Sequence, residues 1–238
     1  MKTSLTDRTV LVIGRGSGIA RAITLAAQEA GANVVVAGRD KATLAVAYDD
    51  AGVTAEEVDV TDEASIAALA ERLGQVDHVV STASARARGA VGDLTHDTVL
   101  ASFNVKVVGA ILLAKYFGPR MPEDGSFVFL SGASARKPMA GMLAVGATNG
   151  ALDVVARTLA VELAPIRVNT VSPGTIDTGA YDGLGEQKKA ALFAAREANS
   201  PARRVGRSDD IAEAVVFALT TTFLTGNSLG IDGGEPLV

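Results

Sequence analysis

A glycine-rich turn near the start of the chain has the spacing of a phosphate-binding loop. The turn follows a β-branched run at Thr9–Ile13 and opens a helical pattern. Glycines let the backbone approach a pyrophosphate, and a helix N-terminus offers free N–H groups and a favourable dipole. A plain tight turn is the alternative, but the strand–turn–helix context favours dinucleotide binding. The residues that we expect to bind the pyrophosphate are Gly14, Arg15, Gly16, Ser17, Gly18 and Ile19.

The end of the second apolar run indicates which dinucleotide binds. An acidic residue there accepts the ribose hydroxyls of NAD, whereas an arginine can hold the additional phosphate of NADP. Gly38 occupies the usual acidic position, and Arg39 follows it. The guanidinium groups of Arg39 and Arg15 suit bidentate phosphate binding, although a solvated surface arginine is the alternative. We expect Asp40 to cap the next helix, and NADP(H) to be preferred over NAD(H).

Composition excludes several other classes of site. The chain has 238 residues, a formal net charge of −5 and no cysteine, so thiolate chemistry and disulfides are excluded. No basic run points to nucleic acid, and neither His78 nor His96 belongs to a cluster with metal-ligand spacing. The segment Met1–Arg8 has no apolar signal core, and the apolar stretch Met139–Ala164 carries charged residues. We therefore expect a soluble cytoplasmic protein without a metal, a membrane or a nucleic-acid partner.

Short apolar runs that alternate with longer helical patterns must position these residues. Continuous apolar runs are typical of strands buried on both faces of a parallel sheet. The fold class expected is α/β: a single-domain Rossmann fold over residues 1–238, with a doubly wound parallel seven-stranded sheet, helices on both faces and a substrate loop at about 173–200. The expected strands are Thr9–Ile13, Asn33–Ala37, Thr54–Val58, Asp77–Ser81, Ser126–Ser131, Ile166–Ser172 and Ser228–Ile231. The expected helices are Ser17–Ala30, Asp40–Tyr48, Asp62–Leu73, Asp97–Phe117, Met139–Leu163, Glu186–Ala198 and Ser208–Leu219.

Over essentially its whole length, the sequence resembles the short-chain dehydrogenase/reductase family. The glycine-rich turn is similar to the family's Thr-Gly-x-x-x-Gly-Ile-Gly, with Ile13 for Thr and Ala20 for the last Gly. The segment Ile166–Asn169, the Ser-Pro-Gly turn after it and the Asp-Gly-Gly at 232–234 also match the family pattern. The resemblance implies a nicotinamide cofactor, and a homodimer or homotetramer assembled through the two longest helices. It further implies that the cofactor contacts Asp59, Val60, Ala83, Asn149, Pro173, Gly174, Ile176 and Thr178.

The catalytic motif of the family, Ser with Tyr-x-x-x-Lys, is absent. When the register is set on the segment Asn149–Leu152, the Tyr position is Val145, the Lys position is Asn149 and the Ser position is Gly132. In the family, the Tyr donates the proton, the Lys lowers its pKa and the Ser polarises the substrate carbonyl. Of the family's four catalytic residues, Asn104 alone is present.

Other residues offer substitutes for the missing proton donor. Tyr181 lies in the substrate loop, where an ordinary loop tyrosine is the stronger alternative. Ser131 and Ser134 follow the fifth strand and either polarise a carbonyl or bond the turn. Lys106 follows Asn104 by two residues, about 200° around a regular helix, so we expect it to point away from the site. The candidate catalytic residues are therefore Asn104, Ser131, Ser134 and Tyr181.

Three hypotheses about function follow. The first is an NADP(H)-dependent oxidoreductase that transfers hydride to a small carbonyl compound, imine or conjugated alkene in a non-standard active site. The second is a catalytically inactive NADP(H)-binding sensor or partner subunit, which the changes at Gly132, Val145 and Asn149 favour. The third is non-redox chemistry, such as that of a lyase, in the same pocket.

Overall fold

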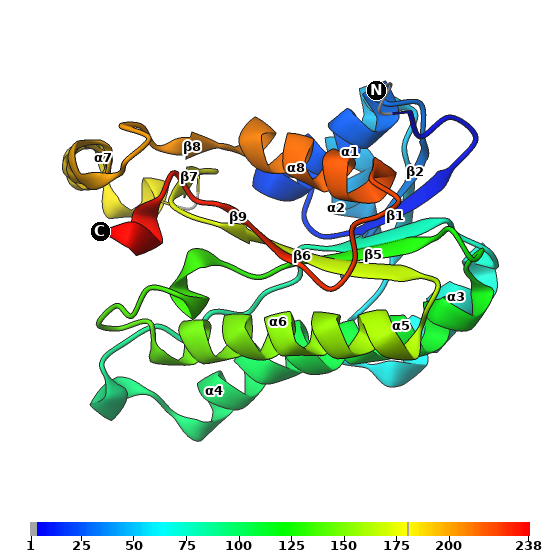
Figure 1. Ribbon diagram of the computed structural model, residues 1–238, viewed down its shortest axis with the longest axis horizontal. Coiled ribbons are helices and arrows are strands. Elements are labelled where there is room, and N and C mark those ends of the chain that lie inside the picture. Colours follow the sequence, from blue (N-terminus) through cyan, green and yellow to red (C-terminus); the bar gives the residue numbers. More distant parts are fainter. Residues whose placement is uncertain (1–3, 180) are drawn as a thin grey trace.

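Seven strands form one parallel sheet in the order β3-β2-β1-β4-β5-β6-β9 (Figure 1). The computed structural model describes residues 4–179 and 181–238. This order, which reverses direction beside β1, is that of a doubly wound Rossmann sheet, so the predicted fold class is confirmed. The strands of the sheet are β1 (Thr9–Ile13), β2 (Asn33–Gly38), β3 (Thr54–Glu57), β4 (His78–Ser81), β5 (Ser126–Leu130), β6 (Arg167–Pro173) and β9 (Ser228–Ile231).

Helices cover both faces of the sheet (Figure 1). On one face α1 packs closely against α8, with α2 beside them, and the other face carries α3, α4, α5 and α6. The helices are α1 (Gly18–Glu29), α2 (Lys41–Ala47), α3 (Glu63–Leu73), α4 (His96–Phe103), α5 (Gly109–Phe117), α6 (Leu143–Glu162), α7 (Glu186–Asn199) and α8 (Ser208–Thr220).

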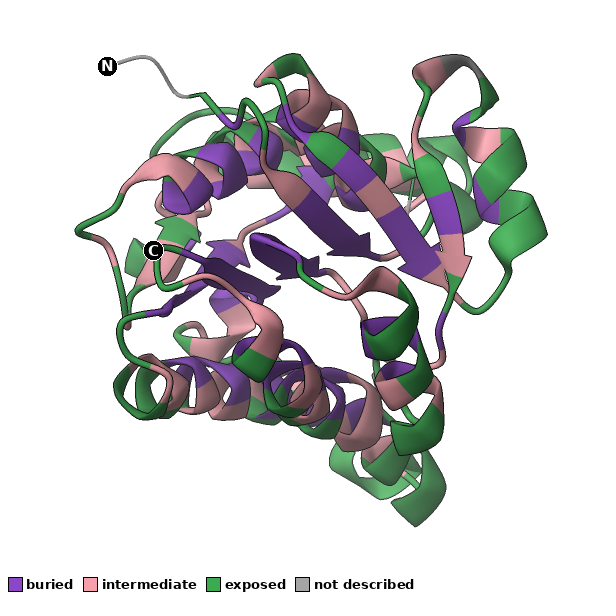
Figure 2. Ribbon diagram, turned by 90° about the vertical axis from the view of Figure 1, so that its right-hand side faces the viewer, coloured by how far each residue is buried: buried purple, intermediate pink, exposed green. Residues whose placement is uncertain are grey.

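The apolar strands are buried between the two helical layers (Figure 2). Side chains alternate between the faces of a strand, so Val10 and Val12 pack under α1 and α8, whereas Leu11 and Ile13 pack under α3 and α5. Two apolar cores therefore clamp the sheet, which explains why its strands carry continuous rather than alternating apolar residues.

The predicted helix at Asp97–Phe117 is wrong in one respect. A π-helical turn, Asn104–Val108, separates α4 from α5, and the Gly109 N–H bonds the carbonyl of Asn104 five residues earlier. The wider turn changes the directions in which the side chains within it point, and such turns are frequent at functional sites.

The start of the predicted helix at Met139 is also wrong. The structure begins α6 at Leu143, because Gly141 has a φ of +76°, which is outside the helical region. The predicted cap at Asp40 is confirmed, since Asp40 Oδ1 accepts the Thr43 N–H at 2.9 Å. Asp62 caps α3 by accepting the Ala64 N–H at 2.9 Å.

A second, two-stranded sheet was not foreseen. Strand β7 (Ile176–Asp177) pairs in parallel with β8 (Gly206–Arg207), and α7 lies between them in the sequence. Strands of two residues have no detectable periodicity, which explains why the sequence did not indicate them. The pair ties both ends of the predicted substrate loop to the carboxyl side of the main sheet (Figure 1).

One helical run, residues 96–120, is long and apolar enough to cross a membrane by length and composition. The core helix of a soluble fold passes the same test. Here Leu113, Ala114 and Phe117 are buried against the sheet, and about a third of the most apolar part of this run is buried inside the protein.

The buried histidine of β4 makes stability depend on pH. Burial lowers the pKa of His78 from 6.5 to about 4, and its Nδ1 lies 2.9 Å from Ser126 Oγ. Between these two pKa values the unfolded chain binds a proton that the folded chain does not. Stability is therefore lost as the pH falls through 6.5 towards 4. From pH 7.5 to 5.5 this group alone should remove about 1 kcal/mol from the free energy of unfolding.

Urea unfolding at the two pH values measures this loss. His78→Gln should lose about 1 kcal/mol less than the wild type over the same interval. His96→Gln is the matched control, because His96 is the only other histidine and is exposed. An identical pH dependence in His78→Gln and the wild type would contradict the prediction.

Candidate active site

A single large cleft opens at the carboxyl ends of the sheet strands. Its volume is about 1420 Å³, larger than the roughly 300–1,000 Å³ of a typical small-molecule pocket. Residues from β1, β2, β5 and β6, from the segment that follows β4 and from the segment between β7 and α7 line it. Ligands of doubly wound sheets bind at this edge, beside the point where the strand order reverses. The cleft has room for a dinucleotide and a substrate together.

The glycine-rich turn forms one wall of the cleft. A Cβ at Gly14 would lie 2.3 Å from Thr82 Oγ1, and Gly18 has a φ of +57°, so only glycine fits both positions. Gly16 does not line the cleft. A Cβ there would lie 2.4 Å from Ala47 Cβ, so this glycine lets the turn pack against α2. Arg15, Ser17 and Ile19 line the cleft as the sequence predicted.

Two arginines stand at the end of the cleft next to β2. Arg15 and Arg39 are exposed, and neither donates a hydrogen bond to a residue that the structure describes. Asp59 also lines this end, but its Oδ1 accepts hydrogen bonds from the Thr61 N–H at 2.9 Å and the Thr61 hydroxyl at 2.7 Å. These bonds, above all the one from the hydroxyl, lower the pKa of Asp59. Val60 and Ala83 complete this part of the lining.

The turn after β6 forms the adjoining wall, because a Cβ at Gly18 would lie 3.2 Å from Thr178 Cβ. Pro173, Gly174, Ile176 and Thr178 all line the cleft. A Cβ at Gly174 would lie 2.7 Å from Asp232 Cα, so the turn depends on close contact with the C-terminal Asp-Gly-Gly segment. The segment at 173–179 is thereby held over the cleft.

The three positions that depart from the family pattern lie together inside the cleft. Val145 and Asn149 are buried on one face of α6, and Gly132 follows β5. A Cβ at Gly132 would lie 2.7 Å from Asn149 Nδ2. Asn149 Nδ2 in turn donates a hydrogen bond to Ser134 Oγ at 2.9 Å. The amide of Asn149 therefore occupies space that a side chain at position 132 would need.

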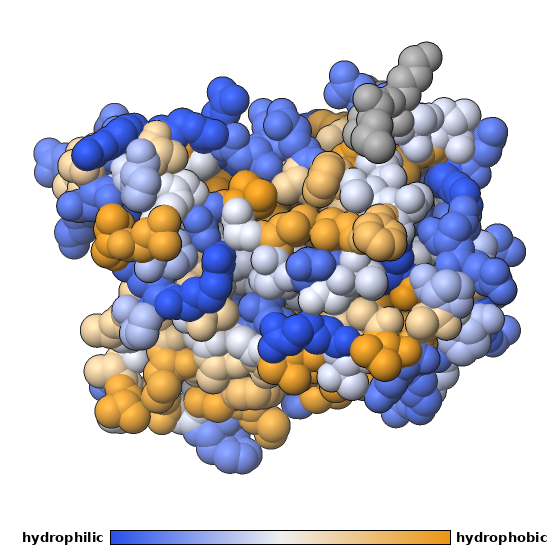
Figure 3. Space-filling model, in the orientation of Figure 1, coloured by the Kyte–Doolittle hydropathy of each residue, from blue (hydrophilic) through white to orange (hydrophobic). Residues whose placement is uncertain are grey.

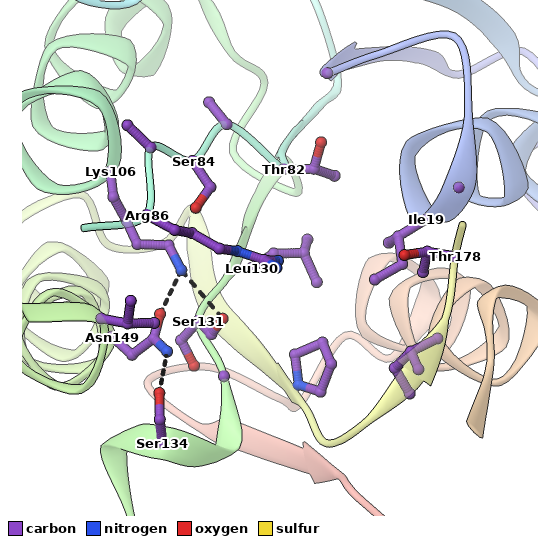
Figure 4. Close-up of a pocket in the computed structure, with 18 of the residues that line it drawn as sticks. Ile19, Thr82, Ser84, Arg86, Lys106, Leu130, Ser131, Ser134, Asn149 and Thr178 are labelled. Carbon is purple, nitrogen blue, oxygen red and sulfur yellow. Dashed lines mark hydrogen bonds between the residues drawn. The ribbon is translucent and has the colours of Figure 1, made fainter. Parts of the chain in front are cut away.

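Lys106 points into this cluster, and the expectation that it points away is wrong. Its Nζ donates hydrogen bonds to Asn149 Oδ1 and to the carbonyl oxygen of Ser131, the latter at 3.2 Å (Figure 4). The side chain is 7% exposed and lines the cleft. Asn104 does not line the cleft. In a regular helix with Asn104 facing the site, Lys106 would point away from it. The π-helical turn changes these directions, so that Lys106 faces the site and Asn104 does not.

Burial lowers the pKa of Lys106 from 10.5 to about 7. Desolvation of the ammonium is the largest cause, and the positive charge of Arg86 lowers the pKa further, whereas Asp153 raises it. A charged residue within the apolar helical segment Val105–Ala114 is the sequence signal that could have identified it.

The other candidate proton donors have different surroundings. Ser131 Oγ is buried at the cleft without a hydrogen-bond partner among the described residues. Ser134 Oγ accepts the bond from Asn149. Tyr181 lines the cleft, and its ring packs edge-on against Phe193 of α7, with centroids 5.6 Å apart. The structure thus brings both serines close to Lys106, whereas Tyr181 belongs to the covering segment.

Several cations around the cleft were not identified from the sequence. Arg86 and Arg88, after β4, and Arg196, on α7, line it. Arg86 and Arg88 donate no hydrogen bond to any described residue, and Figure 4 shows the Arg86 side chain extending across the cleft beside Lys106. Burial among other cations lowers the pKa of Arg86. Arginine side chains in loops are normally solvated, so no pattern along the chain indicated these three residues.

Comparisons with known proteins agree with this geometry. A family model described as enoyl-(acyl carrier protein) reductase matches residues 13–235. The short-chain dehydrogenase/reductase ucsE of Acremonium sp is 30% identical, over 97% of this chain and 96% of that protein. The L-xylulose reductase of Mesocricetus auratus is 31% identical over 98% of both. A solved small-chain dehydrogenase in complex with NADPH is 30% identical, covers 97% of this chain and 99% of its own, and superposes with a TM-score of 0.83.

The packing of Gly132 against Asn149 predicts an energetic coupling. Gly132→Ala should lower the free energy of unfolding by about 1–3 kcal/mol, because the amide that it meets is held at both ends. In an Asn149→Ala background the same change should cost less. Denaturant unfolding of the wild type, the two single variants and the double variant measures this difference. The coupling free energy between the two positions should exceed about 0.5 kcal/mol.

Gly150→Ala is the matched control for this cycle. It lies next to Asn149 on α6, and an added Cβ there meets nothing within 4 Å. The control should leave stability unchanged or raise it, since alanine is the better helix former. If Gly132→Ala proved as harmless as the control, the close contact would be refuted.

Proposed function

The chain belongs to the short-chain dehydrogenase/reductase family, and we propose that it transfers hydride between NADP(H) and a small organic substrate in a non-standard active site. One observation carries this proposal. The cleft retains the backbone features that hold a dinucleotide, while the positions 132 and 145 at its centre carry no hydroxyl group.

The residues present fit a nicotinamide dinucleotide. The Gly14 and Gly18 cradle leaves space that a Cβ would fill, next to the N-terminus of α1. The orphaned hydroxyl of Ser131 lies at the same cleft and needs a partner. When bound, the cofactor supplies or accepts the hydride. Gly14, Ser17 and Gly18 would hold its pyrophosphate, and Pro173 and Thr178 would border its nicotinamide.

The preference for NADP(H) rests on charge. Arg15 and Arg39 present two guanidinium groups at the end of β2, where Gly38 stands in place of an acid. A ribose phosphate there would gain charge-assisted hydrogen bonds from either group. The similar small-chain dehydrogenase whose solved structure contains NADPH supports the same preference.

The missing Tyr hydroxyl restricts the substrate. Val145 can neither donate a proton nor polarise a carbonyl, so an ordinary ketone receives no help from that position. An imine, already cationic when protonated, or a conjugated alkene, protonated later at carbon, needs less help at that point. Holding the reactants together contributes in every case, by up to about 7–11 kcal/mol.

The second candidate function is an NADP(H)-binding sensor or partner subunit without catalysis. The observation that favours it is the apolar side chain of Val145, together with the absence of a side chain at Gly132. Both functions require the same cofactor site, so substrate turnover distinguishes them.

Fluorescence titration tests the cofactor preference. NADPH should bind more tightly than NADH, and Arg39→Gln should weaken NADPH binding by about 10- to 100-fold with little effect on NADH. Arg21→Gln on α1 is the matched control, because Arg21 is exposed and does not line the cleft. Equal affinities of the wild type for both nucleotides would contradict the preference.

Turnover on the same sample tests the reaction. Oxidation of bound NADPH by at least one member of a panel of ketones, cyclic imines and enones is the expected result. Tight NADPH binding with no turnover of any member would support the sensor or partner subunit instead. Failure to bind either nucleotide would overturn both functions.

We also propose that the protein acts in the cytoplasm as a homodimer or homotetramer. Apolar side chains are exposed along α5 and α6, among them Ile111, Val154 and Val161. Figure 3 shows apolar side chains over the lower part of the molecule, where α4 and α6 lie in Figure 1. Two copies that pair these helices would cover this surface.

Light scattering checks the assembly. The measured mass should be two or four times the 24.2 kDa of one chain at micromolar concentration. A mass of one chain would contradict the proposal.

A further inference from the structure

The ammonium of Lys106 has an unused hydrogen in the cleft. A lysine ammonium carries three N–H donors. Asn149 Oδ1 and the Ser131 carbonyl accept two of them, and no described residue accepts the third (Figure 4). Because the side chain lines the cleft, the third donor is available to a bound molecule.

The partners of Lys106 are neutral, which is unusual for a buried charge. Buried ammonium groups are normally paired with a carboxylate, because desolvation costs several kcal/mol. The charged groups that face Lys106 are Arg86, from the segment after β4, and Asp153, from α6. Asp153 Oδ1 accepts hydrogen bonds from the Thr170 hydroxyl at 2.6 Å and the Ser228 hydroxyl at 3.1 Å, and none from Lys106. Lys106 therefore forms no ion pair with a residue that the structure describes, and its hydrogen-bond partners are a neutral amide and a backbone carbonyl.

We propose that Lys106 is the catalytic proton donor, which its amide and carbonyl partners hold at the position where the substrate reacts. The inference rests on the proposed function above. Lys106, in the π-helical turn, would thus take the role of proton donor, for which the sequence offered Tyr181 and two serines as candidates.

The step balances as follows. The substrate carbon of a C=O, C=N or conjugated C=C group gains the hydride of NADPH, so a C–H bond forms and the nicotinamide is oxidised. The π electron pair moves to the far atom of that group. This atom takes a proton from Lys106, so an N–H bond breaks and an O–H, N–H or C–H bond forms. The neutral amine of Lys106 then regains a proton from water in the open cleft.

The surroundings match this task. A general acid works best when its pKa is near the working pH, and Lys106 has a pKa of about 7. The Ser131 hydroxyl, which has no partner among the described residues, lies in the same buried cluster. The positive charge of Arg86, whose side chain lies beside Lys106, lowers the pKa of the ammonium further.

Activity measurements test the role with three variants. Lys106→Met should lower kcat by about 10²- to 10⁴-fold with little change in the affinity for NADPH. Lys106→Arg keeps a positive charge, so it should fold. Because arginine does not release a proton at neutral pH, its kcat should be lowered as much as that of Lys106→Met. Lys115→Met is the control, because Lys115 lies on the exposed side of α5, paired with Glu63. It should retain wild-type activity.

The pH profile separates proton donation from a structural role. The reduction rate of the wild type should fall as the pH rises through about 7, because the protonated form of Lys106 is the donor. Neither Lys106 variant should show this fall. If Lys106→Arg restored the wild-type rate and profile, the lysine would be a structural charge and the proposal would be overturned.

Labelling of the apoprotein provides a readout that does not depend on turnover. Competitive acylation followed by peptide mass spectrometry measures the fraction of each lysine that is neutral at each pH. Lys106 should become reactive around pH 7, whereas Lys115 should become reactive only at higher pH, because its hydrogen bond to Glu63 raises its pKa. Titration of both lysines together would overturn the proposal.

The outcomes distinguish this inference from the function on which it rests. If the wild type turns over no member of the panel, the proposed function is overturned, and the role of Lys106 as a proton donor is overturned with it. Turnover by Lys106→Met at the wild-type rate overturns the inference alone.

Discussion

The desolvated ammonium of Lys106 is the constraint on which the centre of the cleft depends. Removing an ammonium from water costs several kcal/mol unless oxygens replace the lost hydration. These oxygens come from two other elements, the amide of Asn149 on α6 and the backbone carbonyl of Ser131 after β5. The side chain reaches them from the π-helical turn between α4 and α5. Three parts of the fold must therefore be correctly placed before this charge can be buried.

Two of the three departures from the family pattern, those at positions 132 and 149, belong to one arrangement. Asn149 accepts a hydrogen bond from Lys106 and donates one to Ser134, which holds its amide in place. Gly132 leaves room for that amide, because any Cβ at this position would come within 2.7 Å of it. A lysine at position 149 would instead put a second ammonium against Lys106, and like charges at that distance repel strongly. The ammonium group at the centre of the cleft thus comes from the π-helical turn, at Lys106, and not from position 149 on α6.

The cofactor half of the cleft does not depend on this rearrangement. The part of it that would hold the pyrophosphate and the nicotinamide is made mostly from backbone: the glycine-rich turn, the N-terminus of α1 and the turn after β6. Backbone N–H groups and a helix dipole bind phosphate whatever side chains stand at the chemical centre. This explains how a chain with a standard dinucleotide site can have an unusual set of groups around the reacting atoms.

The sequence by itself determined the seven strands of the main sheet, their order along the chain and the glycine-rich turn, because these follow from local patterns of apolar residues and glycines. It predicted β1 and β9 to the residue, and the cap at Asp40. Only the tertiary structure decided which side chains gather around Asn149. The direction of Lys106 depends on a π-helical turn that no local pattern indicates, and its pKa depends on burial among residues distant in the sequence. Hydrogen-bond partners and desolvation arise only when separate elements pack together, so a pattern along the chain cannot contain them.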